Sequence, residues 1–212
     1  MRADENQPWS LVATDQPLKR FSWGIDEGSP RVCTMYHVDT LATFTSPDYL
    51  ERLNNPTPWT RRIMPLFVGM NRTLCTVVST HGHGIGGYLL TIQLTAKPDS
   101  AGRLREWLSD VALPELASRA GLCGAHLLIG DRAVSQTRTQ EKVLRGEPDS
   151  VADWVVLVEG YDRPSVERAR SELDGTLGLA AHGADEMAIT GLYSLDFTLG
   201  ENEAKTIWHK PA

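Results

Sequence analysis

The sequence predicts an α+β fold in which ferredoxin-like β-α-β units form antiparallel sheets. The first observation is that two segments share one plan: a strand, a helix that begins at a proline, and a second strand. These elements are 32–39, 46–53 and 72–80 in one segment, and 154–161, 164–177 and 191–199 in the other. The second observation is their spacing, because Trp154 follows Val32 by 122 residues and Gly191 follows Arg72 by 119. A shared plan at a nearly constant offset predicts a duplicated architecture.

The chain before residue 31 carries little periodicity. Prolines and glycines interrupt residues 1–30 repeatedly, so we expect a loosely packed arm with at most a short strand at 9–13. Residues 32–39 are rich in β-formers and predict a strand. Ser46 then fits an N-cap and Pro47 the first helical position, which together predict where the first helix begins.

Glycine and proline also mark the middle of the chain. Two strands, 72–80 and 87–95, are predicted on either side of the glycine-rich segment 81–87, where positive φ angles are accessible. A helix at 101–120 follows, and Pro114 is expected to kink or restart it. Its predicted apolar stripe consists of Leu104, Leu108, Val111 and Leu116. The remaining elements are a strand at 125–130, a loop with a short helical turn at 131–150, a strand at 153–161, a helix at 164–177 and a strand at 187–199.

These elements predict one complete unit and one half unit. Residues 87–199 follow the order β-α-β-β-α-β of a ferredoxin-like domain, whereas residues 31–86 supply only β-α-β. A half unit leaves an apolar sheet face uncovered, so it must pack on the complete unit or on another subunit. The arm at 1–30 and a polar tail at 200–212 flank them.

Composition excludes several classes of function. With 41% hydrophobic and 23% charged residues, the chain is that of a folded globular protein. The formal charge of −6 argues against a nucleic-acid partner, which requires a basic surface. An apolar run of the ~20 residues needed to span a bilayer does not occur, and the N-terminus lacks a signal-peptide pattern. We therefore expect a cytoplasmic protein with no membrane partner, in which Cys33, Cys75 and Cys123 are small buried residues.

A family resemblance narrows the fold further. The stretch YHVDTLATFTSPDYLERLNNPTPWTRRIMPLFVGMNRTLC at 36–75 resembles the second half of an EthD-like protein, and the segments TRTQEKVLR and ADWVVLVEGYD within 137–162 resemble a second such repeat. The resemblance covers residues 31–199 and implies a dimeric, or pseudo-dimeric, α/β barrel of tandem type with a truncated first repeat. Either the true start lies upstream or a partner chain completes the first unit. The resemblance also implies a small aromatic or lipophilic ligand, a homodimer or higher homo-oligomer, and reactions that range from cofactor-free oxygenation and isomerisation to haem chemistry.

Strand alternation sorts the polar residues between the two faces of the predicted sheet. Ala125 and Leu127 fit the helix-covered face, which turns His126 into the barrel. Asp196 is assigned to the same interior face, because Tyr193 and its apolar neighbours are assigned to the helix-covered face. The polar residues that this rule brings together are Gln93, His126, Glu159, Tyr161 and Asp196.

Three of these residues are the candidate catalytic groups. His126 is the candidate general base, since imidazole titrates near neutrality. Glu159 is expected to orient it, and Tyr161 to stabilise an enolate or phenolate. Gln93 and Asp196 are candidate substrate-binding residues. The alternative for each is an interior polar residue that is hydrogen-bonded for structural reasons.

A second candidate pocket lies on the first strand. His37 and Asp39 share a face there, and with Arg61 they are predicted to bind an anionic group, unless they form surface ion pairs. His37 is also the residue that a haem-binding member of the superfamily would use. His81 and His83 supply two metal ligands at most, and the sequence offers no third, so we expect neither a metal nor a cofactor.

Three hypotheses about function follow. The first is a cofactor-independent enzyme, of the lyase, isomerase, cyclase or monooxygenase type, that transfers protons on a small aromatic or polyketide-like compound. The second is a non-catalytic binding or accessory protein for a hydrophobic metabolite. The third is a paralogue that keeps the barrel and has lost catalysis. Convergence of His126 and Glu159 in a pocket would favour the first.

Overall fold

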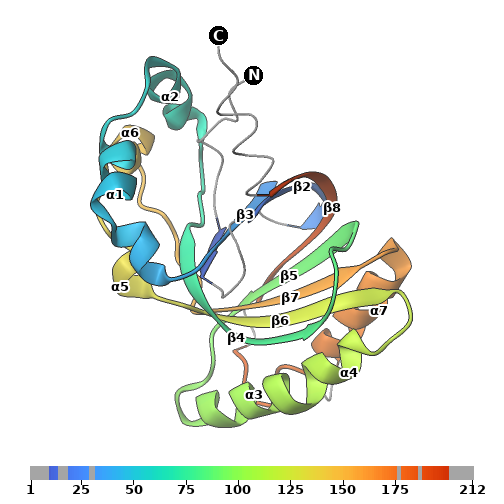
Figure 1. Cartoon of the computed structure of the whole chain (residues 1–212). Coiled ribbons are helices and arrows are strands. Elements are labelled where there is room, and N and C mark those ends of the chain that lie inside the picture. Colours follow the sequence, from blue (N-terminus) through green and yellow to red (C-terminus); the bar gives the residue numbers. More distant parts are fainter. Residues whose placement is uncertain (1–9, 14–18, 29–31, 176–177, 186–187, 201–212) are drawn as a thin grey trace.

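The computed structural model describes residues 10–13, 19–28, 32–175, 178–185 and 188–200. The eight strands in this part of the chain close into a barrel in the order β1-β3-β2-β8-β5-β7-β6-β4 (Figure 1). Their bounds are β1 Ser10–Ala13, β2 Lys19–Gly28, β3 Val32–Val38, β4 Thr73–Gly82, β5 Tyr88–Leu94, β6 Leu122–Gly130, β7 Trp154–Gly160 and β8 Ile189–Gly200. Among the described residues, no helix has the length and apolar character needed to cross a membrane.

The predicted complete unit is present. Strand β5 leads through α3 (Ala101–Trp107), the π-helical segment η4 (Leu108–Ala112) and α4 (Leu113–Ala117) to β6. Strand β7 then leads through α7 (Arg163–Asp174) to β8. The order β8-β5-β7-β6 is antiparallel throughout, as the ferredoxin-like plan requires. The short helices η3 (Pro98–Ser100), α5 (Arg132–Ser135) and α6 (Gln140–Arg145) connect these elements.

The expectation of a loose N-terminal arm is wrong at 19–28, whereas the short strand allowed at 9–13 is present as β1. Residues 10–13 and 19–28 are the barrel strands β1 and β2, and the other residues of 1–30 lie outside the described part. Strands β4-β1-β3-β2 follow the order of the second unit, β8-β5-β7-β6. Only five residues separate β1 from β2, too few for a crossover helix, so the chain reverses direction and β1 pairs in parallel with both β3 and β4.

The barrel closes within one chain. Strand β2 pairs with β8, and β4 pairs with β6, all antiparallel. Both edge strands of the first unit, β2 and β4, therefore pair with strands of the second unit. No partner chain is needed to complete the barrel. The missing strands of the first unit are β1 and β2 of the same chain, which carry too few periodic apolar residues to be recognised from sequence.

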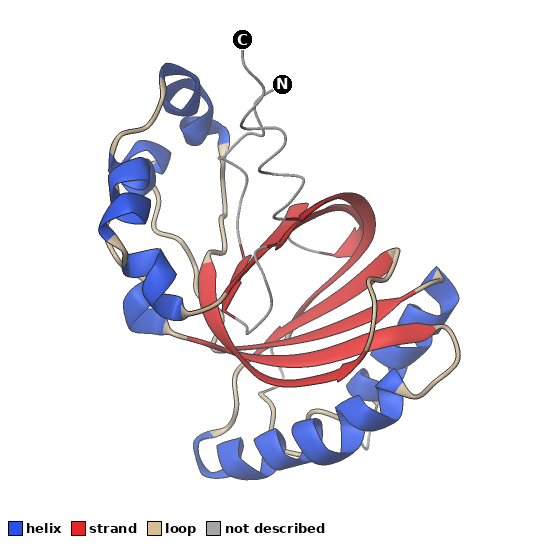
Figure 2. Cartoon of the chain, in the orientation of Figure 1, coloured by secondary structure: helices blue, strands red, loops and turns tan. Residues whose placement is uncertain are grey.

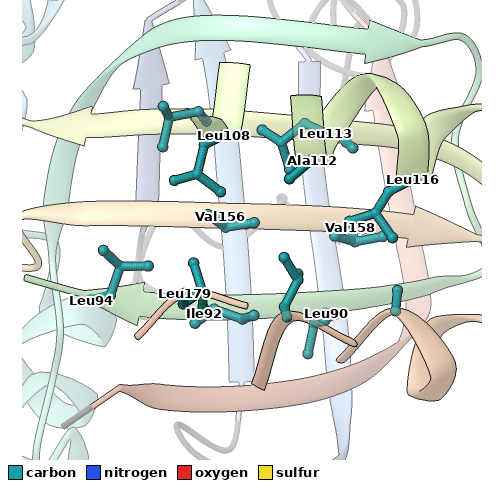
Figure 3. Close-up of a cluster of buried hydrophobic side chains, with 14 of the residues drawn as sticks. Leu90, Ile92, Leu94, Leu108, Ala112, Leu113, Leu116, Val156, Val158 and Leu179 are labelled. Carbon is teal, nitrogen blue, oxygen red and sulfur yellow. The ribbon is translucent and has the colours of Figure 1, made fainter. Parts of the chain in front are cut away.

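The outer face of the second unit forms the larger apolar core. Alternate residues of β5 and β7 pack against α3, η4, α4 and α7 (Figure 3). The predicted stripe on the first helix is correct at Leu104, Leu108 and Leu116 but wrong at Val111, which is 52% exposed. The π-helical segment takes up one extra residue per turn, so Ala112 and Leu113 replace it in the core.

The inner face carries a second cluster, which we call the interior cluster. It consists of Cys33, Met35, Cys75, Leu89, Leu128, Ala152, Val155, Leu157 and Tyr193. Both faces of the sheet in the second unit are therefore apolar, as expected for strands buried on two sides. This is why alternation alone assigns a strand to the wrong face when both of its residue sets are hydrophobic.

A separate helical layer covers the first unit (Figure 2). It contains η1 (Leu41–Thr45), α1 (Pro47–Asn54), α2 (Pro58–Ile63) and η2 (Met64–Leu66), together with α5 and α6. The predicted helix start is confirmed, because the Ser46 hydroxyl accepts a hydrogen bond from the Tyr49 amide and Pro47 is the first helical residue. Phe44 and Val38 pack beneath this layer with Met70 and Leu74.

Candidate functional site

Two polar side chains meet on the interior face of the barrel near one of its ends. His126 Nε2 on β6 lies 3.4 Å from Glu159 Oε1 on β7. Their side chains are 21% and 12% exposed, so both are largely shielded from solvent. On its other side, His126 Nδ1 lies 3.2 Å from the hydroxyl oxygen of Thr80 on β4. The imidazole is thus held between a carboxylate and a hydroxyl, the arrangement that fixes a histidine tautomer.

The backbone register explains why these residues converge. Thr80 pairs with His126 across β4 and β6, and Gly124 pairs with Glu159 across β6 and β7. A Cβ atom at Gly124 would lie 2.9 Å from His126 Nε2 and 3.7 Å from the Glu159 Cβ. The imidazole therefore occupies the space that any other residue at position 124 would fill.

The glycine-rich segment between β4 and β5 lies over the pair. The Gly86 amide donates a hydrogen bond of 2.9 Å to Glu159 Oε2. A Cβ at Gly86 would lie 2.6 Å from the Gly160 nitrogen and 3.0 Å from the Glu159 Cβ, so only glycine allows this approach. Glu159 thus contacts the histidine with one oxygen and the segment with the other.

The rest of the neighbouring wall is apolar. Glu159 pairs with Leu89 on β5, and His126 pairs with Leu157 on β7. Both leucines belong to the interior cluster and are at most 5% exposed. A proton acceptor beside such a surface suits an apolar organic ligand, because it excludes competing water.

The other interior candidates have different fates. Gln93 faces the interior as predicted, but its Oε1 accepts a 2.7 Å hydrogen bond from Asn71, so its amide oxygen belongs to a separate network. Tyr161 follows the end of β7 and is 64% exposed, although its hydroxyl lies near Gly84 and the Cys123 thiol. It therefore lies at the protein surface rather than in the interior.

The assignment of Asp196 to the interior is wrong. Asp196 is exposed, whereas Tyr193 and Leu195 contact the interior cluster. Leu192 occupies the outer core, so the whole strand β8 is turned over relative to the prediction. The cause is that Leu192 is the one β8 residue in the outer core, whereas Tyr193, the large aromatic residue that the prediction assigned to that core, points inward.

The predicted second pocket stays a prediction. His37 is half-buried, and alternation places it on the interior face with Met35. Asp39 and Arg61 are exposed, and Arg61 Nε donates a 3.1 Å hydrogen bond to the Pro56 carbonyl.

The two histidines of the glycine-rich segment diverge. His81 pairs with Ala125 and so faces the outer core, while His83 is exposed. Among the described residues, no cluster of three histidine, cysteine or acidic side chains forms a metal site.

The cysteines are free and buried, as the sequence indicated. Burial raises the pKa of the Cys33 and Cys75 thiols to about 12. The pKa of Cys123 rises to about 11, first through burial and then through the nearby Glu159 carboxylate. Protonated thiols are poor nucleophiles, so thiolate catalysis is not supported.

A buried charged cluster on and just after α6 was not predicted from the sequence. Arg145 donates two hydrogen bonds to Asp149, with Nε–Oδ1 at 3.0 Å and Nη2–Oδ2 at 2.7 Å. Glu141 is 7% exposed, and burial raises its pKa to about 7 despite the opposing charges of Arg145, Arg72 and Arg52. Arg145 Nη1 also lies 3.7 Å from the Met64 sulfur on η2, which joins helix α6 to the first unit. The cluster is separate from the His126–Glu159 pair. Glu141 and Arg145 lie in a six-residue helix that ends at Gly146, and charged residues in so short a helix gave no sequence signal of burial.

Fold and site define an α/β barrel of ferredoxin-like units with a histidine–glutamate pair on its interior face. No protein-family model matches the chain, and no curated protein matches its sequence. Solved structures match its fold. The structure of an anthrone oxidase-like protein is 12% identical, with a TM-score of 0.53 over 88% of this chain and 80% of the other. A "Putative monooxygenase" from Fusobacterium nucleatum subsp. nucleatum is 10% identical, with a TM-score of 0.53 over 89% and 80%. At these identities the likeness establishes the fold alone.

Proposed function

We propose that this protein is a cofactor-independent enzyme that removes a proton from a small aromatic or polyketide-like carbon acid and allows the carbanion to react with O₂. The observation that carries the proposal is the His126–Glu159 contact of 3.4 Å beside the apolar interior cluster. The names of the two structural neighbours, anthrone oxidase-like and monooxygenase, agree with this class of reaction.

The side chains suggest a division of roles. The Glu159 carboxylate favours a proton on His126 Nε2, which leaves a lone pair on Nδ1 beside the Thr80 hydroxyl. His126 then accepts a proton from a methylene carbon conjugated to a carbonyl. Such a base typically contributes ~10²–10⁴-fold in rate. Glu159 stabilises the imidazolium that forms, and Gly86 holds the carboxylate in place.

The overall reaction balances without a bound cofactor. The carbanion transfers electrons to O₂ as a carbon–oxygen bond forms, and the peroxide takes the proton back from His126. Loss of the second C–H proton with cleavage of the O–O bond gives a ketone and one water. One O₂ is consumed for each methylene oxidised, so oxygen is the oxidant and the substrate the reductant.

Anthrone is the probe that tests this proposal, because its methylene lies between two aryl rings and opposite a carbonyl. Wild-type protein should convert it to anthraquinone with matching oxygen uptake. His126→Ala should lose at least about 100-fold of this rate. His182→Ala is the matched control, since His182 stacks on Trp107 among the outer helices. Equal rates for wild type and His126→Ala would overturn the assignment of the base.

The second hypothesis, a binding protein without catalysis, is distinguished by the same assay. It gives tight binding of anthraquinone without turnover of anthrone. The predicted homodimer is an expectation for sedimentation to test; His126, Glu159, Thr80 and Gly86 all belong to one chain, so we propose a site that acts without a partner.

A further inference from the structure

A row of paired residues crosses the interior wall at the level of His126. Pairing joins His126 to Leu157, Leu157 to Thr91, and Thr91 to Gly191. Directly paired residues in antiparallel strands share a face, so all four lie on the interior side. Neighbouring strands are ~4.8 Å apart, which makes the row ~14 Å long from β6 to β8. In a closed barrel these three steps lead from His126 toward the facing wall.

The Tyr193 ring lies over the far end of this row. A Cβ at Gly191 would be 2.3 Å from the Tyr193 hydroxyl oxygen and 2.6 Å from its Cζ. The ring therefore folds back along β8 into the space that glycine leaves, and its hydroxyl reaches the level of Thr91. Tyr193 is fully buried within the interior cluster.

The Thr91 hydroxyl beside it is a second buried polar group on the same wall. Thr91 is 4% exposed, and within the described part of the chain its Oγ1 makes no well-aligned hydrogen bond. Such a group is costly to bury unless a ligand or water satisfies it. Burial raises the pKa of Tyr193 and the nearby Cys33 adds to the rise, while the approach of the Thr91 hydroxyl to the phenol opposes it. The phenol therefore stays protonated, and able to donate, at neutral pH.

We propose that Tyr193 and Thr91, on the wall that faces His126, form a subsite that binds the carbonyl oxygen of the ligand. The inference rests on the proposed function and narrows its ligand to ring ketones whose carbonyl lies across the ring from the acidic carbon. When His126 removes the proton from such a ligand, negative charge moves to the carbonyl oxygen. A donor at that oxygen stabilises the charge where it develops, which is how an oxyanion site accelerates a reaction.

Two probes with the same tricyclic skeleton test the subsite without requiring turnover. Anthraquinone carries ring carbonyls, and anthracene carries none. Wild-type protein should bind anthraquinone about 10-fold more tightly, and infrared spectra should show the bound carbonyl band at lower frequency than in hexane. Tyr193→Phe should remove both the preference and most of the shift, and Thr91→Val should reduce them. Tyr88→Phe is the matched control, because Tyr88 packs against the outer core.

The outcomes separate the subsite from the proposed reaction. His126→Ala should keep the carbonyl shift, since binding needs no base. A shift that is lost in Tyr193→Phe supports the subsite even if anthrone is not oxidised, and in that case only the reaction fails. Anthrone turnover with an unchanged shift and an unchanged preference in Tyr193→Phe and Thr91→Val would overturn the subsite and leave the reaction standing. The subsite would also be overturned if wild-type protein bound anthraquinone no more tightly than anthracene.

Discussion

Removing the carboxylate of Asp149 should destabilise the protein more than any single exposed charge. Asp149 and Arg145 have side chains that are only 2% and 4% exposed, and they share two hydrogen bonds. Lys142 Nζ also lies 3.6 Å from Asp149 Oδ2. Asp149→Ala removes the carboxylate that lies beside both Arg145 and Lys142 and leaves these two cations near each other on helix α6. Breaking a buried pair in this way typically costs ~3–5 kcal/mol.

The assay is thermal and urea unfolding at neutral pH. For a chain of 150–250 residues, each kcal/mol lowers Tm by ~2–4 °C, so Asp149→Ala should lower it by ~6–20 °C. Asp153→Ala is the matched control, because Asp153 binds Arg132 at 2.6 Å with side chains that are 37% and 55% exposed. Exposed pairs contribute ~0–1 kcal/mol. The double variant Arg145→Met with Asp149→Leu should recover part of the loss, since Arg145 is then no longer a buried charge without its carboxylate and only Lys142 of the two cations remains. Equal losses for Asp149→Ala and Asp153→Ala would refute the reasoning.

Three further predictions concern the pH response, the site and the N-terminal strands. Burial raises the pKa of Glu141 to about 7, above its unfolded value, so its stabilising contribution is complete at low pH and lost as pH rises through 7. The stability of Glu141→Gln relative to wild type should therefore increase between pH 5 and 8.5, by an amount on the order of 3 kcal/mol. Urea titrations of the two proteins at each pH check this. Gly124→Ala should displace the His126 imidazole and lower the rate of anthrone oxidation at least about 10-fold, with little change in Tm. Gly102→Ala is the control, because a Cβ there meets no atom within 4 Å and the rate should stay unchanged. Equal rates for the two variants would count against the site. Deleting residues 1–30 removes β1 and β2, opens the barrel at β3, β4 and β8, and should abolish cooperative unfolding, as calorimetry would show.

The second unit and some elements of the first were predictable from sequence because their signals are strong and local. The helix start at Ser46 and Pro47, the strands on either side of 81–87, and the inward direction of His126 and Glu159 all follow from capping, turn chemistry and alternation. Asp196 and Tyr193 were exchanged between faces because both faces of β8 carry apolar residues.

The first two strands were missed for a different reason. Their pairing with β3, β4 and β8 is non-local, and no crossover helix announces them in the sequence. Val111 was misplaced because a π-helical turn has no reliable sequence signature. Strand alternation was enough to predict that His126 on β6 and Glu159 on β7 face the same side. The roles of Gly124 and Gly86 could not be predicted, because they depend on how closely the backbone approaches these side chains in three dimensions.

The most direct test of a proton acceptor in the barrel is anaerobic hydrogen–deuterium exchange of anthrone in D₂O, followed by NMR of its methylene protons. Without oxygen, this measurement isolates proton transfer from oxidation. The account predicts that wild-type protein accelerates exchange above the buffer rate and that His126→Ala loses ~10²–10⁴-fold of this acceleration, while Tyr88→Phe retains it. Exchange at the same rate with wild type and His126→Ala would contradict the assignment of His126 as the base.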